Sequence, residues 1–358
     1  MFTLDQFTYD LPEELIAQAP SELRDHCRLL QLDRQTGEVQ HSFFYDLPNV
    51  LRPTDLIVRN NTKVIPARIF GQKPTGGHVE LLLITPTEML STTCRWECLS
   101  KPGLKIGQTL SFENTALTAT CIELSGYTRI IEFNQPYLTF LQTLDQIGHT
   151  PLPPYIHWAG DDELALRELY QTTYAKLSGS VAAPTAGLHF TPELDANLKN
   201  KGIQIEEVTL HVGMGTFFPL QDEQLKTRKL HQEKLSLSVE TAAKIMAAKQ
   251  EGRRIISVGT TTTRVLESCW RNDTLQPGEA STELFIQPGY KFQVVDGLIT
   301  NFHLSRSSLL FLVSAFVTEP NTSHPFENFA QTPIGKAYQT AIEKNYKFFS
   351  FGDAMLIL

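Results

Sequence analysis

The arrangement of β-prone segments between residues 68 and 133 most constrains the fold of this chain. Six short β-prone runs follow one another, separated only by turn signals rich in Gly, Pro and Asn, and they cover residues 68–71, 78–85, 92–100, 108–112, 117–123 and 128–133. Short strands at this spacing predict a small antiparallel barrel. We expect one helix over 137–147 to close it, before a stiff Pro-rich connection at 151–155.

In the rest of the chain the predicted elements are spaced further apart, and helices occur among them. After residue 165 we expect helices over 164–170, 238–249, 262–269, 307–316 and 334–345, and strands over 203–212, 254–258 and 290–295. Strands that alternate with helices predict an α/β sheet. In such sheets ligands bind at loops beyond the carboxyl ends of the strands, so the loops of this part are where we expect the active site.

Composition excludes several classes of protein. The chain has 358 residues, of which 41% are hydrophobic and 20% charged, as in an ordinary globular protein of about two domains. The longest apolar run, 309–317, is too short for a membrane helix, and no signal peptide is apparent. Five scattered cysteines predict free thiols in the cytoplasm. Because the net charge is −8, nucleic acid would have to bind a local basic surface.

The segment 178–191 combines small residues with two glycines, a proline and His189. The residues after it predict a helix: Thr191 suits the N-cap, a proline follows, and Gly202 ends the helix. His189 therefore lies just before a helix N-terminus, where backbone N–H groups favour an anionic ligand. The alternative is a tight, buried strand-to-helix turn.

Two other loops are candidates for ligand binding. The segment 208–217 ends a predicted strand in a Gly-x-Gly loop, but it lacks the third glycine and the immediate helix of a dinucleotide site. That absence argues against a Rossmann site and the common methyltransferase fold, and leaves a simple strand-end turn as the alternative. The Thr-rich segment 258–264 is a plausible anion or ribose cradle, or only an N-cap. The polar segment 60–68 reads as a third candidate or as a domain crossover.

Four histidines lie on or near loops, at positions 189, 211, 231 and 303, and Asp296 and Asn301 follow a predicted strand together with His303. Imidazole is the natural proton carrier near neutral pH, so several loop histidines favour a proton-transfer site. No His-x-x-x-His or Cys-x-x-Cys pair occurs, and the Cys94–Cys98 pair lacks a third cysteine. We therefore expect no metal.

Several long motifs resemble one family. They include Gly179-Ser-Val-Ala-Ala-Pro-Thr-Ala-Gly-Leu-His-Phe-Thr191 and Leu298-Ile-Thr-Asn-Phe-His-Leu304, together with 10–18, 64–68, 151–156, 208–213, 258–261 and 349–357. In order and nearly over the whole length, the chain is similar to S-adenosylmethionine:tRNA ribosyltransferase-isomerases of the queuosine pathway. It departs from the family pattern at Cys27, where Ser is usual, and at Asn61, Lys63, Arg228 and Ser305-Arg306.

This resemblance implies a fold and a reaction. The fold would be α/β, a discontinuous α/β domain (1–68 and 151–358, the second part with the active site) with an inserted small antiparallel β-barrel domain (69–150). The enzyme would transfer and isomerise the ribosyl moiety of S-adenosylmethionine onto 7-aminomethyl-7-deazaguanine at the tRNA wobble position. Epoxyqueuosine, adenine and methionine would form, so S-adenosylmethionine would be consumed and no cofactor is expected. We expect a monomer without a membrane partner.

The residues assigned to this chemistry fall into three groups. The catalytic candidates are His189, His211, His303, Asp296 and Asp353. The substrate-binding candidates are Thr185, Gly187, Gly213, Thr216, Thr260, Thr261, Asn301, His231 and Arg68. The tRNA-binding candidates are the basic side chains Lys226, Arg228 and Lys229.

A different class of protein stays open at this point. The chain could be a non-catalytic tRNA-binding protein that uses the barrel as an oligonucleotide platform. Such platforms interleave basic and aromatic residues on their strands, and the predicted barrel strands contain few of either. The loop histidines would also have no role. Adenine release from S-adenosylmethionine separates the two readings.

Overall fold

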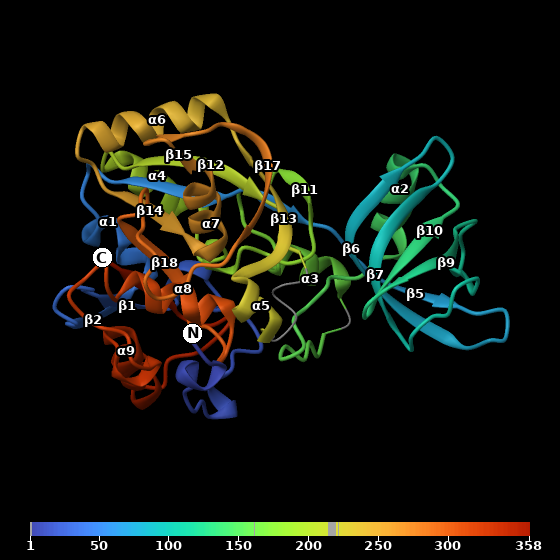
Figure 1. Ribbon diagram of the computed structural model, residues 1–358, viewed down its shortest axis with the longest axis horizontal. Coiled ribbons are helices and arrows are strands. Elements are labelled where there is room, and N and C mark those ends of the chain that lie inside the picture. Colours follow the sequence, from blue (N-terminus) through green and yellow to red (C-terminus); the bar gives the residue numbers. More distant parts are fainter. Residues whose placement is uncertain (1, 161, 214–219, 221) are drawn as a thin grey trace.

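The computed structural model describes residues 2–160, 162–213, 220 and 222–358. A large part built on a mixed nine-stranded sheet carries helices, and a closed six-stranded barrel projects from one side of it (Figure 1). This confirms the predicted α/β fold with a small antiparallel barrel. No helix among the described residues is long and apolar enough to cross a membrane.

The large sheet has the strand order β17-β13-β12-β3-β14-β18-β19-β1-β2. Its centre is parallel, because β12, β3, β14 and β18 all run the same way, and β1 is parallel to β19. The other neighbours are antiparallel. The strands are β1 Arg28–Leu32, β2 Val39–Phe43, β3 Leu56–Asn60, β12 Gln204–Leu210, β13 Lys229–Leu237, β14 Ile255–Val258, β17 Gly278–Leu284, β18 Gly297–Asn301 and β19 Ala354–Ile357.

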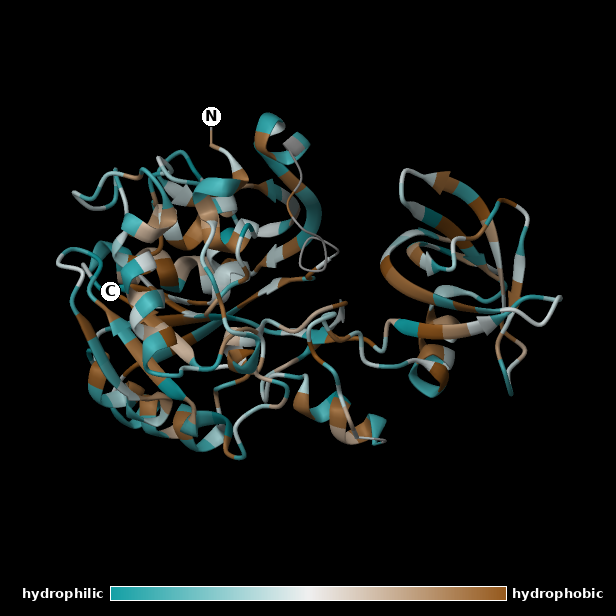
Figure 2. Cartoon of the chain, turned by 90° about the horizontal axis from the view of Figure 1, so that it is seen from below, coloured by the Kyte–Doolittle hydropathy of each residue, from teal (hydrophilic) through white to brown (hydrophobic). Residues whose placement is uncertain are grey.

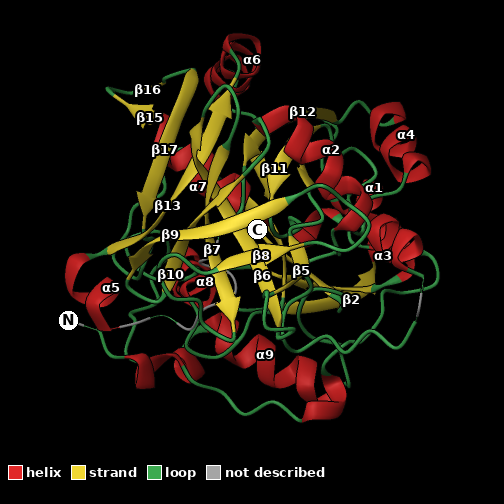
Figure 3. Cartoon of the chain, turned by 90° about the vertical axis from the view of Figure 1, so that its right-hand side faces the viewer, coloured by secondary structure: helices red, strands yellow, loops and turns green. Residues whose placement is uncertain are grey.

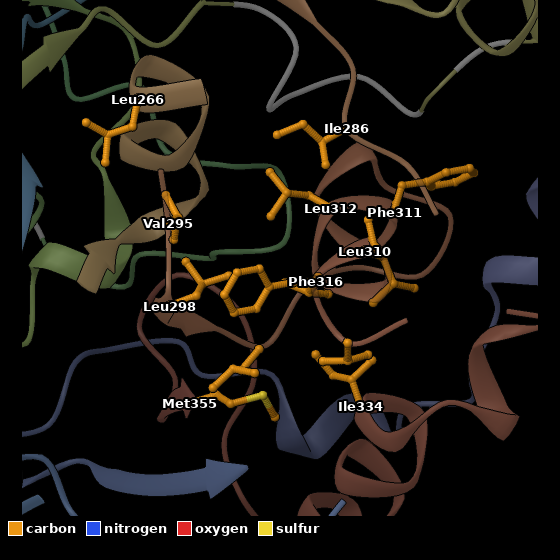
Figure 4. Close-up of a cluster of buried hydrophobic side chains, with 14 of the residues drawn as sticks. Leu266, Ile286, Val295, Leu298, Leu310, Phe311, Leu312, Phe316, Ile334 and Met355 are labelled. Atoms are coloured by element: carbon orange, nitrogen blue, oxygen red, sulfur yellow. The ribbon is translucent and has the colours of Figure 1, made fainter. Parts of the chain in front are cut away.

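Helices cover both faces of this sheet. Successive strand residues point to opposite faces, so Leu298 joins one core and Ile299 the other. The first core packs against α6 Val239–Gln250, α7 Gly259–Cys269, α8 Ser308–Phe316 and α9 Pro333–Glu343. Figure 4 shows side chains of α7, α8 and α9 meeting Leu298 and Met355 of the sheet. The second core packs against α1 Leu47–Val50 and α4 Pro192–Asn200, which lie side by side (Figure 3).

The barrel closes in the order β10-β7-β6-β5-β8-β9, and its neighbouring strands are antiparallel. It has its own hydrophobic core around Trp96, separate from the cores of the sheet, and Figure 2 shows it set apart from the larger part. The elements are β5 Arg68–Gln72, β6 His78–Met89, β7 Cys94–Lys101, β8 Thr109–Ser111, β9 Thr118–Ser125, β10 Thr128–Phe133 and α2 Tyr137–Ile147. All six predicted strands and the predicted helix are present.

Shorter elements complete the chain. They are β4 Thr62–Val64 paired with β11 Leu177–Ser180, β15 Trp270–Arg271 paired with β16 Thr274–Leu275, α3 Glu163–Leu169, α5 Asp222–Thr227 and the 3-10 turns Leu4–Phe7, Glu13–Leu15, Arg24–His26, Phe44–Asp46, Thr185–Gly187 and Phe329–Gln331. The expected start of α4 is confirmed, because the Thr191 hydroxyl accepts the Leu194 N–H at 3.1 Å. Thr191 thus caps the helix after the Gly-rich segment.

One predicted strand is wrong, and several strands, among them β13 and β17 of the large sheet, were not predicted. Residues 290–295 form no strand, because the Glu267 carboxylate accepts the N–H groups of Gln293, Val294 and Val295 at 3.0, 3.0 and 3.1 Å. The strand of this region is β18, which starts two residues later. β13 and β17 were missed because both alternate many exposed polar residues with few buried ones.

Candidate active site

A cavity of about 280 Å³ lies at the carboxyl ends of β12, β14 and β18. This is the edge of a parallel sheet where ligands are expected. Most of its wall comes from five segments that are distant in sequence: 183–186, 230–233, 259–264, 300–309 and the Pro-rich connection at 154–155. The Gly-rich segment, the Thr-rich segment and the loop after β18, which were singled out from the sequence, therefore meet in one place.

The first turn of α7 supplies hydroxyl groups to this cavity. Thr260 and Thr261 line it, as the sequence predicted for a cradle. The next two threonines turn back on the chain, because Thr262 Oγ1 donates to the Val258 carbonyl at 2.6 Å and Thr263 Oγ1 to the Gly259 carbonyl at 3.1 Å. Only the first two hydroxyls are therefore placed for a ligand, beside the helix N-terminus.

His303 lies in the wall of the cavity and is held firmly. Its Nε2 lies 2.7 Å from Thr300 Oγ1, and its backbone N–H donates to Tyr338 Oη at 2.9 Å. Tyr9 Oη donates to the His303 carbonyl oxygen at 2.5 Å. Burial lowers the pKa of His303 to about 3, because an imidazolium would lose its hydration there. The ring is therefore neutral at physiological pH.

An ion pair at the back of the cavity was missed from the sequence. Arg264 Nη1 pairs with Glu233 Oε2, and both side chains are buried. Arg264 Nε donates to the Leu284 carbonyl at 3.1 Å, and Glu233 Oε1 accepts the Gly213 N–H at 2.9 Å. Arg264 Nη2 has no partner among the described residues. The sequence does contain a signal for Arg264, because this residue lies four residues after Thr260 and thus on the same face of the helix.

Asn301 and His189 meet at the edge of the cavity, but only Asn301 lines it. The amide nitrogen Nδ2 of Asn301 lies 3.1 Å from His189 Nε2, and His189 Nδ1 lies 3.2 Å from Cys27 Sγ. Burial lowers the pKa of His189 to about 4. His189 was expected to act on the substrate, whereas its ring lies behind Asn301 and both of its nitrogens have a partner.

His211 and Gly213 line a second cavity of about 690 Å³ between the barrel and the sheet. His211 Nδ1 lies 2.8 Å from Thr62 Oγ1, and burial, followed by the charge of Lys234, lowers its pKa. The two cavities adjoin, since His231 and Glu233 line both. His231 Nε2 also lies 3.3 Å from Tyr127 Oη of the barrel, so this histidine touches both parts of the molecule.

Asp296 and Asp353, both expected to be catalytic, line neither cavity. Asp296 precedes β18, at the opposite edge of the sheet, and its Oδ2 accepts the Ile255 N–H at 2.9 Å. Asp353 accepts the backbone N–H groups of Arg28 and Lys347, both at 2.7 Å. Burial raises the pKa of Asp353. Both carboxylates tie backbone segments together.

The other substrate-binding candidates lie in different parts of the structure. Thr185 lines the first cavity, whereas Arg68 lies at the start of the barrel and pairs with Glu80, with 2.7 Å between Nε and Oε1. Gly187 faces Tyr174, because a Cβ atom on it would lie 2.0 Å from Tyr174 Oη. Arg68 and Gly187, both expected to bind substrate, therefore do not line this cavity. Thr216 lies outside the described residues.

The three basic candidates lie at the junction of α5 and β13, and all are exposed. Lys229 Nζ pairs with Glu283 at 2.8 Å, and Arg228 has a left-handed backbone with φ of 55°. The junction flanks the first cavity, since Gln224 and Leu230 line it.

Among residues 2–160, 162–213, 220 and 222–358, no group of three or more His, Cys, Asp or Glu side chains is arranged to hold a metal ion. All five cysteines are free and buried, as thiols were predicted to be free. The polar side chains that line the smaller cavity include hydroxyls, amides, imidazoles and one ion pair.

Sheet, barrel and cavity together define an α/β protein with a candidate ligand site at the carboxyl edge of its parallel strands. The family described as "queuosine biosynthesis protein" matches residues 4–357. The S-adenosylmethionine:tRNA ribosyltransferase-isomerases of Carboxydothermus hydrogenoformans and Staphylococcus aureus are 48% and 47% identical over 357 and 361 residues, with 99% of each chain covered. A crystal structure of the S-adenosylmethionine tRNA ribosyltransferase from Thermotoga maritima is 36% identical, with a TM-score of 0.55, covering 99% of this chain and 100% of that one.

The chain belongs to the family of S-adenosylmethionine:tRNA ribosyltransferase-isomerases of queuosine biosynthesis, and it is an enzyme of that transferase class. The resemblance seen in its motifs is thereby confirmed. The alternative class, a non-catalytic tRNA-binding protein, is set aside because the full-length relatives carry the name of an enzyme.

Proposed function

We propose that this enzyme transfers and isomerises the ribosyl moiety of S-adenosylmethionine onto 7-aminomethyl-7-deazaguanine at the tRNA wobble position. The products are epoxyqueuosine in tRNA, adenine and methionine. S-adenosylmethionine is in this proposal a substrate that is consumed, and no cofactor takes part. The names of the full-length relatives support the two substrate classes.

The observation that carries the proposal is the pair of adjoining cavities. The smaller cavity, of about 280 Å³, is lined by Thr260, Thr261 and Asn301 and suits S-adenosylmethionine. The larger one, of about 690 Å³, opens between barrel and sheet and has room for a nucleotide of a tRNA loop. A reaction that joins two large substrates needs two such sites with a common wall, which His231 and Glu233 form here.

The chemistry requires three proton transfers. A base removes a proton from the carbon beside the sulfonium, an acid protonates the departing adenine, and the amine of the deazaguanine loses a proton. His303 is neutral and lines the smaller cavity, so we assign it the part of proton acceptor or hydrogen-bonding group toward S-adenosylmethionine. His231 lies at the common wall, so we assign it exchange with the amine.

The test uses S-adenosylmethionine labelled in its adenine ring and a tRNA that carries 7-aminomethyl-7-deazaguanine. We expect release of labelled adenine and a matching gain of mass in the wobble nucleoside. The same tRNA with guanine at that position is the control and should give no adenine. Binding of both substrates without adenine release would contradict the proposal.

A further inference from the structure

Three buried side chains form a row that ends at the smaller cavity. Cys27 Sγ lies 3.2 Å from His189 Nδ1, and His189 Nε2 lies 3.1 Å from Asn301 Nδ2. The three residues are 6%, 5% and 2% exposed, respectively, so water does not compete for these contacts. The row connects three segments far apart in sequence: the turn before β1, the Gly-rich segment and the end of β18.

The amide nitrogen of Asn301 fixes the tautomer of His189. An amide NH₂ group can only donate, so Nε2 of the imidazole must accept and carries no hydrogen. The ring is neutral, since burial lowers its pKa to about 4, and its single hydrogen is therefore on Nδ1 and points to Cys27 Sγ.

The same contact fixes Asn301. With Nδ2 directed at His189, the carbonyl oxygen Oδ1 is left on the other side, in a residue that lines the smaller cavity. Oδ1 is buried and has no hydrogen-bond partner among the described residues. A buried carbonyl oxygen without a partner costs about 1–3 kcal/mol, so this acceptor is poised for a donor that the protein itself does not supply.

We infer that His189 is a positioning residue, which orients the Asn301 amide so that its carbonyl oxygen accepts a hydrogen bond from an N–H or O–H group of S-adenosylmethionine. The identity of the ligand rests on the proposed function, whereas the orientation of the amide does not. His189 contacts no substrate in this arrangement. It acts as a fixed acceptor behind Asn301, and Cys27 holds the opposite side of the ring.

The orientation is tested first without any substrate. The side-chain ¹⁵N resonances of His189, assigned by their loss in His189→Gln, report which ring nitrogen carries hydrogen. We expect a protonated Nδ1 and an unprotonated Nε2 at pH 7. A protonated Nε2 would overturn the inference, because Asn301 would then turn its NH₂ group to the cavity.

The consequence for the substrate is tested with two replacements of similar size. His189→Gln can place an oxygen where Nε2 lies and keep the Asn301 amide in place, whereas His189→Leu cannot. We expect His189→Leu to raise KM for S-adenosylmethionine about five- to tenfold while the turnover rate changes less than about threefold, the loss of one hydrogen bond made in both ground and transition states. His189→Gln should recover most of that loss.

Other outcomes decide against the inference. A turnover rate that falls by about a hundredfold or more in both His189 variants would make His189 a proton carrier. An unchanged KM in a folded His189→Leu protein would make its role purely structural. If the wild-type protein bound no S-adenosylmethionine by calorimetry, the proposed function would fail, and the ¹⁵N tautomer would still decide the orientation of Asn301. Thermal denaturation of each variant controls for folding.

Discussion

The side-chain amide of Asn60 pairs with both backbone groups of Leu210. Its Nδ2 donates to the Leu210 carbonyl at 2.9 Å, and its Oδ1 accepts the Leu210 N–H at 3.0 Å. The amide thus continues the parallel pairing of β3 with β12, whose last backbone pair is Asn60 with Val208. Asn60 Nδ2 also lies 3.3 Å from Thr261 Oγ1, so this additional pair of hydrogen bonds lies directly beside the smaller cavity.

Replacing Asn60 should therefore destabilise the whole edge of the sheet. Asn60→Asp removes the donor to Leu210 and places a carboxylate at a position that is 0% exposed. We expect a loss of about 3 kcal/mol or more, and a melting temperature lower by roughly 5 °C. The control is Asn61→Ala, a partly exposed neighbour that bonds Thr209 and Glu207, which should cost less than half as much. Equal shifts in the two variants would contradict this account.

The pH dependence of unfolding should reveal the two buried imidazoles. In the folded protein the pKa values of His189 and His303 are about 4 and about 3, whereas an exposed imidazole titrates near 6.5. The unfolded chain therefore binds more protons as pH falls below about 6.5, so stability decreases from pH 7 toward pH 4. For His303 alone the loss at pH 5 is about 2 kcal/mol.

His303→Gln removes this pH-dependent contribution to the free energy of unfolding. Its melting temperature should fall less between pH 7 and pH 5 than that of the wild type, even if the variant is less stable at pH 7. His78→Gln, at an exposed position of the barrel, serves as the control for a general loss of one imidazole. Parallel curves for His303→Gln and wild type would mean that the pKa of His303 in the folded protein equals that in the unfolded chain.

The barrel was predictable because its signals are local. Each strand is a short β-prone run, each turn has its own Gly, Pro or Asn, and most antiparallel neighbours (β5 with β6, β6 with β7, β8 with β9 and β9 with β10) follow one another along the chain. The helices α4 and α6 were predictable for the same reason, since Thr191 and Ser238 cap them within three residues. The cavity also appeared at the expected edge of the sheet.

The positions of the other site candidates could not be predicted, because they depend on contacts between distant segments. Asp296 was placed in the site because a strand was expected at 290–295, and only the Glu267 carboxylate, 26 to 28 residues away, prevents that strand. β18 then starts after Asp296 and carries it to the opposite edge. His189 and His303 both follow loop signals in the sequence, and only packing decides that one lies behind Asn301 and the other faces the cavity.

Gly187 should be required by packing against Tyr174. A Cβ atom at position 187 would lie 2.0 Å from Tyr174 Oη, and the buried Tyr174 ring cannot withdraw, since the Arg59 guanidinium lies 3.6 Å from its centre. We expect Gly187→Ala to destabilise the protein by about 1–3 kcal/mol in thermal denaturation. Tyr174→Phe removes the hydroxyl, which has no partner among the described residues, and should rescue much of the loss in the double variant. No rescue would place the clash elsewhere.

Chelators should leave adenine release intact. The described part of the chain offers no group of three side chains suited to a metal, and the proposed proton transfers use imidazoles. The measurement compares turnover before and after EDTA treatment, with magnesium restored so that the tRNA stays folded. Activity that is lost with EDTA and returns only with one transition metal would contradict this prediction.

The last prediction concerns the surface that binds tRNA. An acidic chain can hold an anionic stem only where its basic residues are gathered, and Lys226, Arg228 and Lys229 are exposed beside the smaller cavity. Replacing all three with Glu should weaken tRNA binding and flatten the dependence of log affinity on log salt by up to about three units. Binding of S-adenosylmethionine should change little, since salt limits the reach of exposed charges to about 8–10 Å.

The matched control replaces Lys199, Lys201 and Lys249, near the opposite edge of the sheet, and makes the same change in net charge. If both triple variants lost affinity equally, net charge would explain the effect, and an unchanged slope in the first would place the tRNA elsewhere.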